Sequence, residues 1–221
     1  MMAGYTNFEF SWEVANKVGG IYQVIKSKVP VSIEELGYDN YVLIGPKFSD
    51  KVVHTEVEPA ELRDPIMQAT VNAMRERGIG VFCGKWLVDG LPQGICSNVS
   101  VISTVLLSVR GSLILNKSKV ILFDIGSLSK HLDEWRHELF SKTRISGPFS
   151  DSEFNDCILF GFGCAWFIGE YLHQFNKEHG QDPLTICHFH EWLAGVGLII
   201  SKIRKVWSSP TNQYPNNFKL S

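Results

Sequence analysis

Residues 8–28 read FEFSWEVANKVGGIYQVIKSK, and this stretch decides the fold because it combines a strand, a glycine turn and a helix. Phe8–Val14 is rich in aromatic and β-branched residues, which is typical of a strand. A Gly-Gly pair follows, and Ile21–Lys28 then predicts a helix that runs into Pro30. A strand that leads through a glycine turn into a helix is the beginning of a βαβ unit, so the sequence predicts a parallel sheet.

The rest of the chain continues this alternation of strands and helices. Further strands are expected at 41–44, 80–88, 120–124 and 184–190, and further helices at 65–77, 131–141, 154–175 and 194–205. Asp64-Pro65 is a typical helix start, with Gly78 just past the expected end. The run Ser150–Glu153 is a capping box that opens a long helix, apolar nearly all round and therefore expected in the core. The prediction is an α/β, Rossmann-like, doubly wound sheet whose strands all end at one edge.

Composition excludes several classes of function. The 221 residues carry a net charge of -2, so there is no basic surface of the kind that binds nucleic acid or anionic membranes. The first residues lack the charged and apolar regions of a secretory signal. None of the five cysteines forms a C-x-x-C pair, which argues against a zinc site. These observations favour a cytoplasmic protein with reduced thiols.

The loop Asn16–Gly20 (NKVGG) is the first candidate binding site, because it follows a strand and opens a helix. Gly19 and Gly20 would let the backbone approach an anion closely, and Lys17 would add a positive charge for a diphosphate. The alternative is a tight turn with an exposed lysine. The loop is neither a P-loop nor the G-x-G-x-x-G of dinucleotide-binding folds.

The second candidate is His188–Trp192 (HFHEW), at the end of the last expected strand. Alternation places His188 and His190 on the same side of that strand. We expect His188 to be a packing residue and His190 to emerge into a cleft, where it would donate to a sugar hydroxyl or a carbonyl. The two histidines could also bind a metal, but no third ligand of matching spacing is evident.

Taken together, these motifs resemble the animal and fungal glycogen synthases. The resemblance covers residues 8–92 and 119–205, and it rests on residues 12–22 (WEVANKVGGIY), 43–46 (LIGP), 84–87 (GKWL), 153–156 (EFND) and 188–198 (HFHEWLAGVGL). It implies the N-terminal half of a two-domain glycosyltransferase of the GT-B type. It also implies retaining transfer of glucose from UDP-glucose to a non-reducing 4-hydroxyl of glycogen, with no metal or other cofactor.

By the same resemblance, the residues that bind the UDP-glucose donor are Lys17, Gly19, Gly20, His190 and Glu191. Fixed positive charge and backbone donors at these positions would stabilise a diphosphate leaving group. The family further implies glycogen and a glycogen primer protein as partners, and assembly into homo-oligomers.

Two segments have no counterpart in the family pattern. Residues 93–118 (QGICSNVSVISTVLLSVRGSLILNKS) interrupt residues 1–205, and we interpret them as translated intron or an alternative exon. They are too short and too rich in hydroxyl groups for a membrane span. Residues 206–221 are polar and are expected to be a disordered tail. The family's second domain, with its catalytic glutamate, is expected to be missing, so no catalytic set is complete and little transfer activity is expected.

Two other functions stay open at this stage. A non-catalytic interaction module could bind full-length subunits or the primer protein. A nicotinamide-dependent oxidoreductase is the default for a Rossmann-like sheet, but the glycine fingerprint and the acidic residue about 20 positions further on are both missing.

Overall fold

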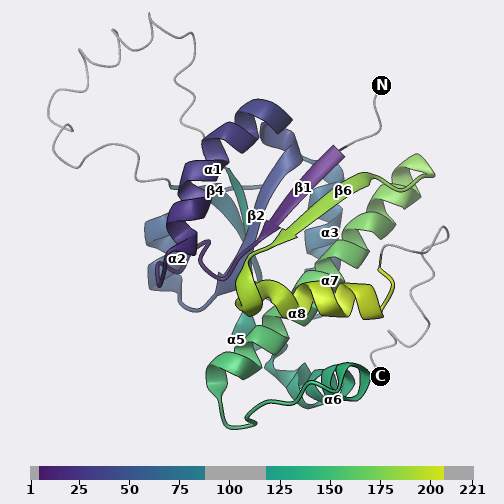
Figure 1. The fold of residues 1–221 in the computed structure, drawn as a ribbon. Helices are drawn as coiled ribbons and strands as arrows, with labels where there is room; N and C mark the ends of the chain where they lie inside the picture. The colour runs from purple at the N-terminus through teal and green to yellow at the C-terminus, as the bar shows by residue number, and fades with distance from the viewer. Residues whose placement is uncertain (1–4, 88–117, 207–221) are drawn as a thin grey trace, which may run out of the picture.

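The computed structural model describes residues 5–87 and 118–206, which form one twisted sheet with helices on both faces (Figure 1). The strands are β1 (Tyr5–Phe10), β2 (Tyr41–Lys47), β3 (Val57–Pro59), β4 (Val81–Trp86), β5 (Lys119–Asp124) and β6 (Leu184–Phe189). The α-helices are α1 (Ile21–Leu36), α2 (Asp50–Glu56), α3 (Pro65–Glu76), α5 (Ile125–Leu128), α6 (Leu132–Thr143), α7 (Ser152–His179) and α8 (Glu191–Ile203). Short 3₁₀ turns cover Tyr38–Asn40 and Ser129–His131.

The strand order is β3-β4-β5-β2-β1-β6, and the four strands β5, β2, β1 and β6 are parallel. The expected Rossmann-like α/β architecture is therefore confirmed. The expectation that every strand ends at one edge is wrong for β4, which runs antiparallel to β5 and to β3. The chain passes from β3 through α3 and enters β4 antiparallel to β3.

The helices divide between the two faces of the sheet. Helices α1 and α2 cover one face, where their apolar residues join a small core with Tyr41, Leu43 and Trp86. Helices α3, α6, α7 and α8 cover the other face and bury a much larger core. The connection from β1 to β2 thus crosses one face, and the connection from β5 to β6 crosses the other. This is the doubly wound topology that the sequence predicts.

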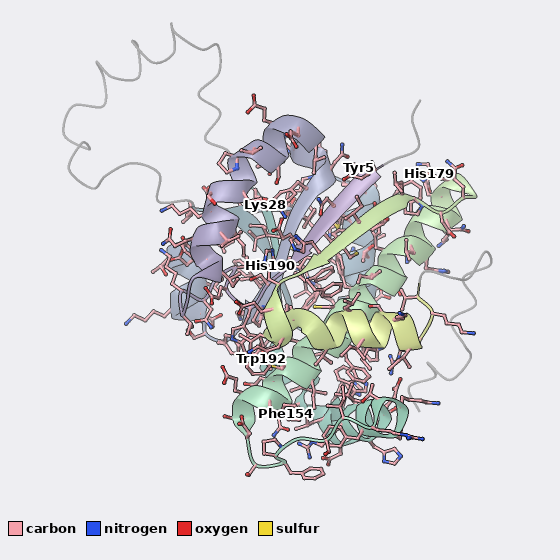
Figure 2. All side chains as sticks on the ribbon, viewed as in Figure 1. Tyr5, Lys28, Phe154, His179, His190 and Trp192 are labelled. Atoms are coloured by element: carbon pink, nitrogen blue, oxygen red, sulfur yellow. The ribbon has the colours of Figure 1, made fainter. Side chains whose placement is uncertain are left out.

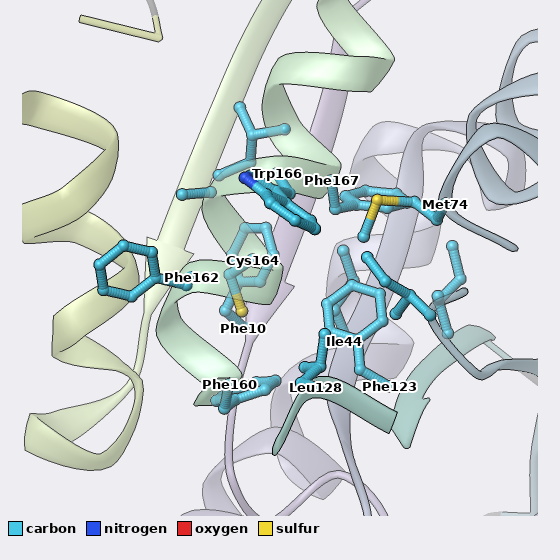
Figure 3. Close-up of a cluster of buried hydrophobic side chains, with 14 of the residues drawn as sticks. Phe10, Ile44, Met74, Phe123, Leu128, Phe160, Phe162, Cys164, Trp166 and Phe167 are labelled. Carbon is cyan, nitrogen blue, oxygen red and sulfur yellow. The ribbon is translucent and has the colours of Figure 1, made fainter. Parts of the chain in front are cut away.

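The larger core is built around α7 and is strongly aromatic (Figure 3). Phe167 meets Phe8 edge to face with ring centroids 5.3 Å apart, and Trp135 stacks on Phe162 at 4.8 Å. Both arrangements are favourable for aromatic rings. Seventeen of the 28 residues of α7 are buried, as expected for a helix that is apolar on nearly all sides.

Several boundaries differ from those predicted. Strand β1 ends at Phe10, four residues earlier than expected, and α1 continues through Pro30 to Leu36. Pro30 lies on the exposed side of α1, where water can hydrate the carbonyl left without a donor. The cap of α7 is Asp151, whose side chain accepts from the amide of Phe154, one residue after the expected Ser150.

The start of α3 agrees with the prediction. Asp64 accepts from the amide of Met67, and Gly78 adopts a φ of 79° just past the end. The sequence analysis missed α2, β3 and α5, which are too short to show a clear periodicity.

Two expectations fall on residues outside this description. Only Ser118 of the segment 93–118, and only Val206 of the segment 206–221, are described, so the proposed insertion and the proposed disordered tail stay predictions. Within residues 5–87 and 118–206 there is no helix with the length and apolar character needed to cross a bilayer. The four cysteines in those ranges are free thiols, as expected.

Candidate functional site

The topology places a switch point between β1 and β6. These strands are neighbours along their whole length, from the pair Tyr5–Leu184 to the pair Phe10–Phe189. After β1 the chain leads to α1 on one face, and after β6 it leads to α8 on the other. Ligands of open α/β sheets bind at the carboxyl ends of strands whose connections diverge in this way. Both predicted binding segments, the Lys17 loop and His190-Glu191, follow these two strands.

The loop from Ser11 to Gly20 is held against the sheet by close backbone packing. An added Cβ on Gly45 of β2 would lie 2.8 Å from the Cβ of Val14 and 3.0 Å from the carbonyl oxygen of Ser11. The indole nitrogen of Trp86 donates to the carbonyl of Val14 at 2.9 Å. The GP and KW pairs seen in the sequence therefore position the loop after β1.

Lys17 lies in an ion pair at the surface of this loop. Its ammonium is 2.7 Å from Glu56 Oε1 and 4.8 Å from the centroid of the Tyr22 ring. The hydroxyl of Tyr22 donates to Glu56 Oε2 at 3.1 Å. Burial and the neighbouring Glu56 raise the pKa of Tyr22, so this hydroxyl stays a donor at neutral pH. The side chain of Lys17 remains 40% exposed, which leaves its charge within reach of a ligand.

The beginning of α1 already holds a carboxylate. The buried side chain of Glu13 accepts from the amide of Tyr22 at 2.8 Å, in the place where an anion is favoured at a helix N-terminus. An added Cβ on Gly19 would lie 2.7 Å from Glu13 Oε1, so this glycine is required by the close approach of that carboxylate. Gly20 has ordinary helical angles and nothing within 4 Å of an added Cβ. The space beside Gly20 is therefore open.

His190 lies beside β1 and is buried (Figure 2). Its Nε2 is 2.6 Å from Oε1 of Glu9, which is completely buried near the carboxyl end of β1. Lys28 of α1 donates to the same oxygen at 2.9 Å, and the hydroxyl of Tyr41 donates to Oε2. Burial alone would raise the pKa of Glu9, but hydrogen bonds from His190, Tyr41 and Lys28 lower it to about 2.

The expectation for the two histidines is wrong in one respect. His188, expected to be the packing residue, has a side chain that is 48% exposed, whereas the side chain of His190 is only 7% exposed. The two rings do share a side, as alternation predicts, with centroids 4.3 Å apart. His188 Nδ1 lies 2.9 Å from the ammonium of Lys28. Partial burial and the positive charge of Lys28 lower the pKa of His188.

The third ligand that the sequence analysis did not find is Glu9. Ligand atoms of Glu9, His188 and His190 all lie within 4.8 Å of one another, which is the spacing of a possible metal site. The ammonium of Lys28, however, lies 2.9 Å from both Glu9 and His188. A divalent cation would compete with this ammonium for the same atoms. The ammonium of Lys28 therefore takes the position beside the Glu9 carboxylate that a metal ion would need.

Glu191 is exposed at the first position of α8, with a φ of 57°. A left-handed conformation is uncommon for a residue other than glycine, and such residues concentrate at ligand sites. The structure thus brings His190 and Glu191 to the switch point. They follow β6, which lies next to β1, the strand that leads to Lys17. The two segments have separate anionic partners, Glu9 for His190 and Glu56 for Lys17.

Sequence reasoning missed Glu9, Glu13 and Glu56. One signal was available, since an acidic residue between Phe8 and Phe10 in a buried strand needs a partner. The partner's identity was not predictable, because His190 is 181 residues away.

The fold and the site define a Rossmann-like α/β domain with a charged loop at its switch point. A family model described as glycogen synthase matches residues 9–114 and 104–210. The chain belongs to the glycogen synthase family. A glycogen (starch) synthase of Neurospora crassa is 39% identical over 199 residues, 90% of this chain and 24% of that protein. A glycogen (starch) synthase of Caenorhabditis elegans is 37% identical over 90% of this chain and 25% of that protein. The human liver glycogen (starch) synthase is 36% identical over 90% of this chain and 24% of that protein. The chain thus spans about a quarter of the length of these relatives.

Proposed function

We propose that this chain forms the N-terminal part of a UDP-glucose site for the elongation of glycogen. The observation that carries the proposal is the switch point, where the Lys17 loop and His190-Glu191 follow adjacent strands whose connections diverge. In the family reaction, glucose moves with retention to a non-reducing 4-hydroxyl of glycogen. The whole protein would act in the cytoplasm, without a metal, on glycogen begun by a primer protein, as a homo-oligomer.

The chemistry of the two segments fits this substrate. Transfer of glucose leaves UDP with a diphosphate charge, which a nearby lysine stabilises as a point charge. Lys17 is 40% exposed, and its buried partner Glu56 also accepts from the hydroxyl of Tyr22, so Glu56 would keep one donor if the ammonium turned toward a phosphate. Gly20 would let a phosphate approach the backbone, because no side chain occupies that space. His190 would contact the glucose part of the donor, which carries no charge.

Binding of UDP-glucose tests the proposal directly. We expect isothermal titration calorimetry on the 221-residue chain to detect UDP-glucose binding, and Lys17→Ala to weaken it about 10- to 100-fold, as for loss of a hydrogen bond to a charged group. Lys142→Ala is the matched control, because Lys142 is an exposed lysine on α6, which covers the opposite face. Equal affinities for the wild-type and K17A chains, with both folded by circular dichroism, would contradict the proposal.

Transfer is a separate measurement. We expect this chain alone to incorporate little or no radiolabelled glucose from UDP-glucose into glycogen, since positioning of both reactants contributes about 7–11 kcal/mol in such reactions. Incorporation at the rate of a full-length relative would show that the described sheet carries more of the catalytic machinery than we propose.

A further inference from the structure

Glu9 is a fully buried carboxylate in the interior of the sheet, and each of its oxygens has a donor. Oε1 accepts from Lys28 and faces Nε2 of His190, and Oε2 accepts from the hydroxyl of Tyr41. The hydrogen bonds outweigh burial and keep the pKa of Glu9 at about 2, so the group is a carboxylate at neutral pH. A carboxylate accepts hydrogen bonds and donates none.

This has a consequence for the proton on His190. With an acceptor 2.6 Å from Nε2, the hydrogen bond forms only if Nε2 carries the proton. In the neutral ring, Nδ1 then keeps its lone pair. Among the residues that the structure describes, Nδ1 of His190 has no hydrogen-bond partner. The backbone amide of His190 also donates to the carbonyl of Phe10 at 3.0 Å, which fixes the backbone of His190 relative to β1.

The remaining members of the cluster surround Glu9 with further donors. Lys28 forms an ion pair with Glu9. Tyr41 stays a neutral donor, because burial and the adjacent carboxylate raise its pKa. The ring of His188 lies against that of His190 and contacts the ammonium of Lys28 through Nδ1. Lys28, Tyr41 and His190 thus contact Glu9 directly, and His188 contacts Lys28.

We propose that Glu9 is a positioning residue, which holds His190 as the Nε2–H tautomer and leaves Nδ1 available as a hydrogen-bond acceptor. The ligand class that matches is a hydroxyl donor, such as a sugar hydroxyl. The identity of that ligand rests on the proposed function, whereas the tautomer does not. The sequence-based expectation that His190 donates to a sugar hydroxyl is therefore reversed: the hydroxyl donates and His190 accepts.

Nuclear magnetic resonance of the ¹⁵N-labelled 221-residue chain, without ligand, tests the tautomer. Two-bond ¹H–¹⁵N spectra at pH 8 should show the proton of His190 on Nε2, with His190→Gln used for assignment. The Nε2–H proton should resonate far downfield, because its acceptor is a nearby carboxylate. Glu9→Ala should abolish this signal through exchange with water. Tyr41→Phe, which removes the donor to the other oxygen of Glu9, should leave the signal in place.

A second variant keeps the test valid if E9A does not fold. In Glu9→Gln the amide oxygen can still accept from His190 while its NH₂ group donates to Tyr41. We therefore expect the Nε2–H signal to persist in E9Q and to move upfield, since the acceptor is now neutral. A wild-type ring protonated on Nδ1, or an Nε2–H signal that neither Glu9 variant changes, would overturn the proposal.

A ligand measurement then connects the tautomer to binding. The ratio of affinities for UDP-glucose and UDP isolates the contacts made by the sugar. This ratio should fall about tenfold in E9A and stay within about twofold in E9Q, as expected for one hydrogen bond. If UDP-glucose does not bind at all, the proposed function fails while the tautomer result stands. If it binds but the ratio in E9A equals that of the wild type, the positioning role is refuted.

Discussion

The two faces of the sheet differ in kind. The face under α3, α6, α7 and α8 is filled by aromatic and aliphatic side chains. The face under α1 and α2 has a smaller apolar core, and beside it lies the polar cluster of Glu9, Lys28, Tyr41, His188 and His190. On β6, the outward-facing Leu184 and Ile186 lie on this second face and are 63% and 45% exposed. The first face carries most of the stability, and the second carries the candidate chemistry.

The largest expected effect is on the aromatic face. Phe167→Ala should lower the free energy of unfolding by about 3–5 kcal/mol, because Phe167 is fully buried between Phe8 and Phe123 and leaves a cavity. Val31→Ala is the control on the exposed side of α1 and should stay within about 0.5 kcal/mol. Urea titration followed by fluorescence measures both. A loss below about 1 kcal/mol for F167A would show that this face is loosely packed.

The next effect is on the polar face and depends on pH. The folded-state pKa of Glu9, about 2, is below its ordinary value of 4.5, so Glu9 stabilises the fold above pH 4.5 and loses this contribution as pH falls toward 2. The shift corresponds to about 3 kcal/mol. Glu9→Gln should therefore be less stable than the wild type by about this amount at pH 7, with the difference shrinking between pH 4.5 and 2. A difference that is constant across that range would argue against a charged Glu9.

A smaller effect is expected where α7 and α8 cross on the aromatic face. An added Cβ on Gly161 would lie 2.6 Å from Val196 and 2.7 Å from the backbone nitrogen of Gly197. Gly161→Ala should cost about 1–3 kcal/mol by forcing the helices apart. Gly195→Ala is the matched control, since nothing lies within 4 Å of an added Cβ there, and it should be neutral or slightly stabilising. Thermal unfolding of both variants gives the comparison, and equal melting temperatures would contradict it.

The smallest effect on stability is expected at the edge strand of the polar face. Replacing both Leu184 and Ile186 by Thr should change the free energy of unfolding by less than about 1 kcal/mol, because both side chains are largely exposed. It should lower self-association in sedimentation velocity, since an apolar edge strand pairs with other chains. Val24→Thr also replaces an exposed apolar side chain by threonine, but on α1, and it should leave association unchanged. If the wild type and all variants self-associate to the same extent, the β6 edge is not the surface through which the chains associate.

The sequence predicted the aromatic face better than the polar one. The capping residue Asp64 and the apolar run of α7 are local signals, which short-range patterns report well, whereas the cap of α7 was expected one residue too early. The direction of β4 was not predictable, because the residue pattern of a short strand does not show whether its neighbours run parallel or antiparallel to it. The partners of His190 and Lys17 were missed for a different reason: Glu9 and Glu56 come from separate elements, and only the fold brings them together.

The position of β1 also has a consequence for synthesis on the ribosome. This strand lies in the interior of the sheet, and one of its two neighbours is β6, the last strand among the described residues, with Tyr5 opposite Leu184. At about 5–20 residues per second, translation of the roughly 180 residues between these partners takes about 10–35 s. Throughout that time one side of β1 has no partner, and Glu9 lacks His190. A chaperone that covers nascent strand edges would therefore act on this protein mainly before β6 has been made.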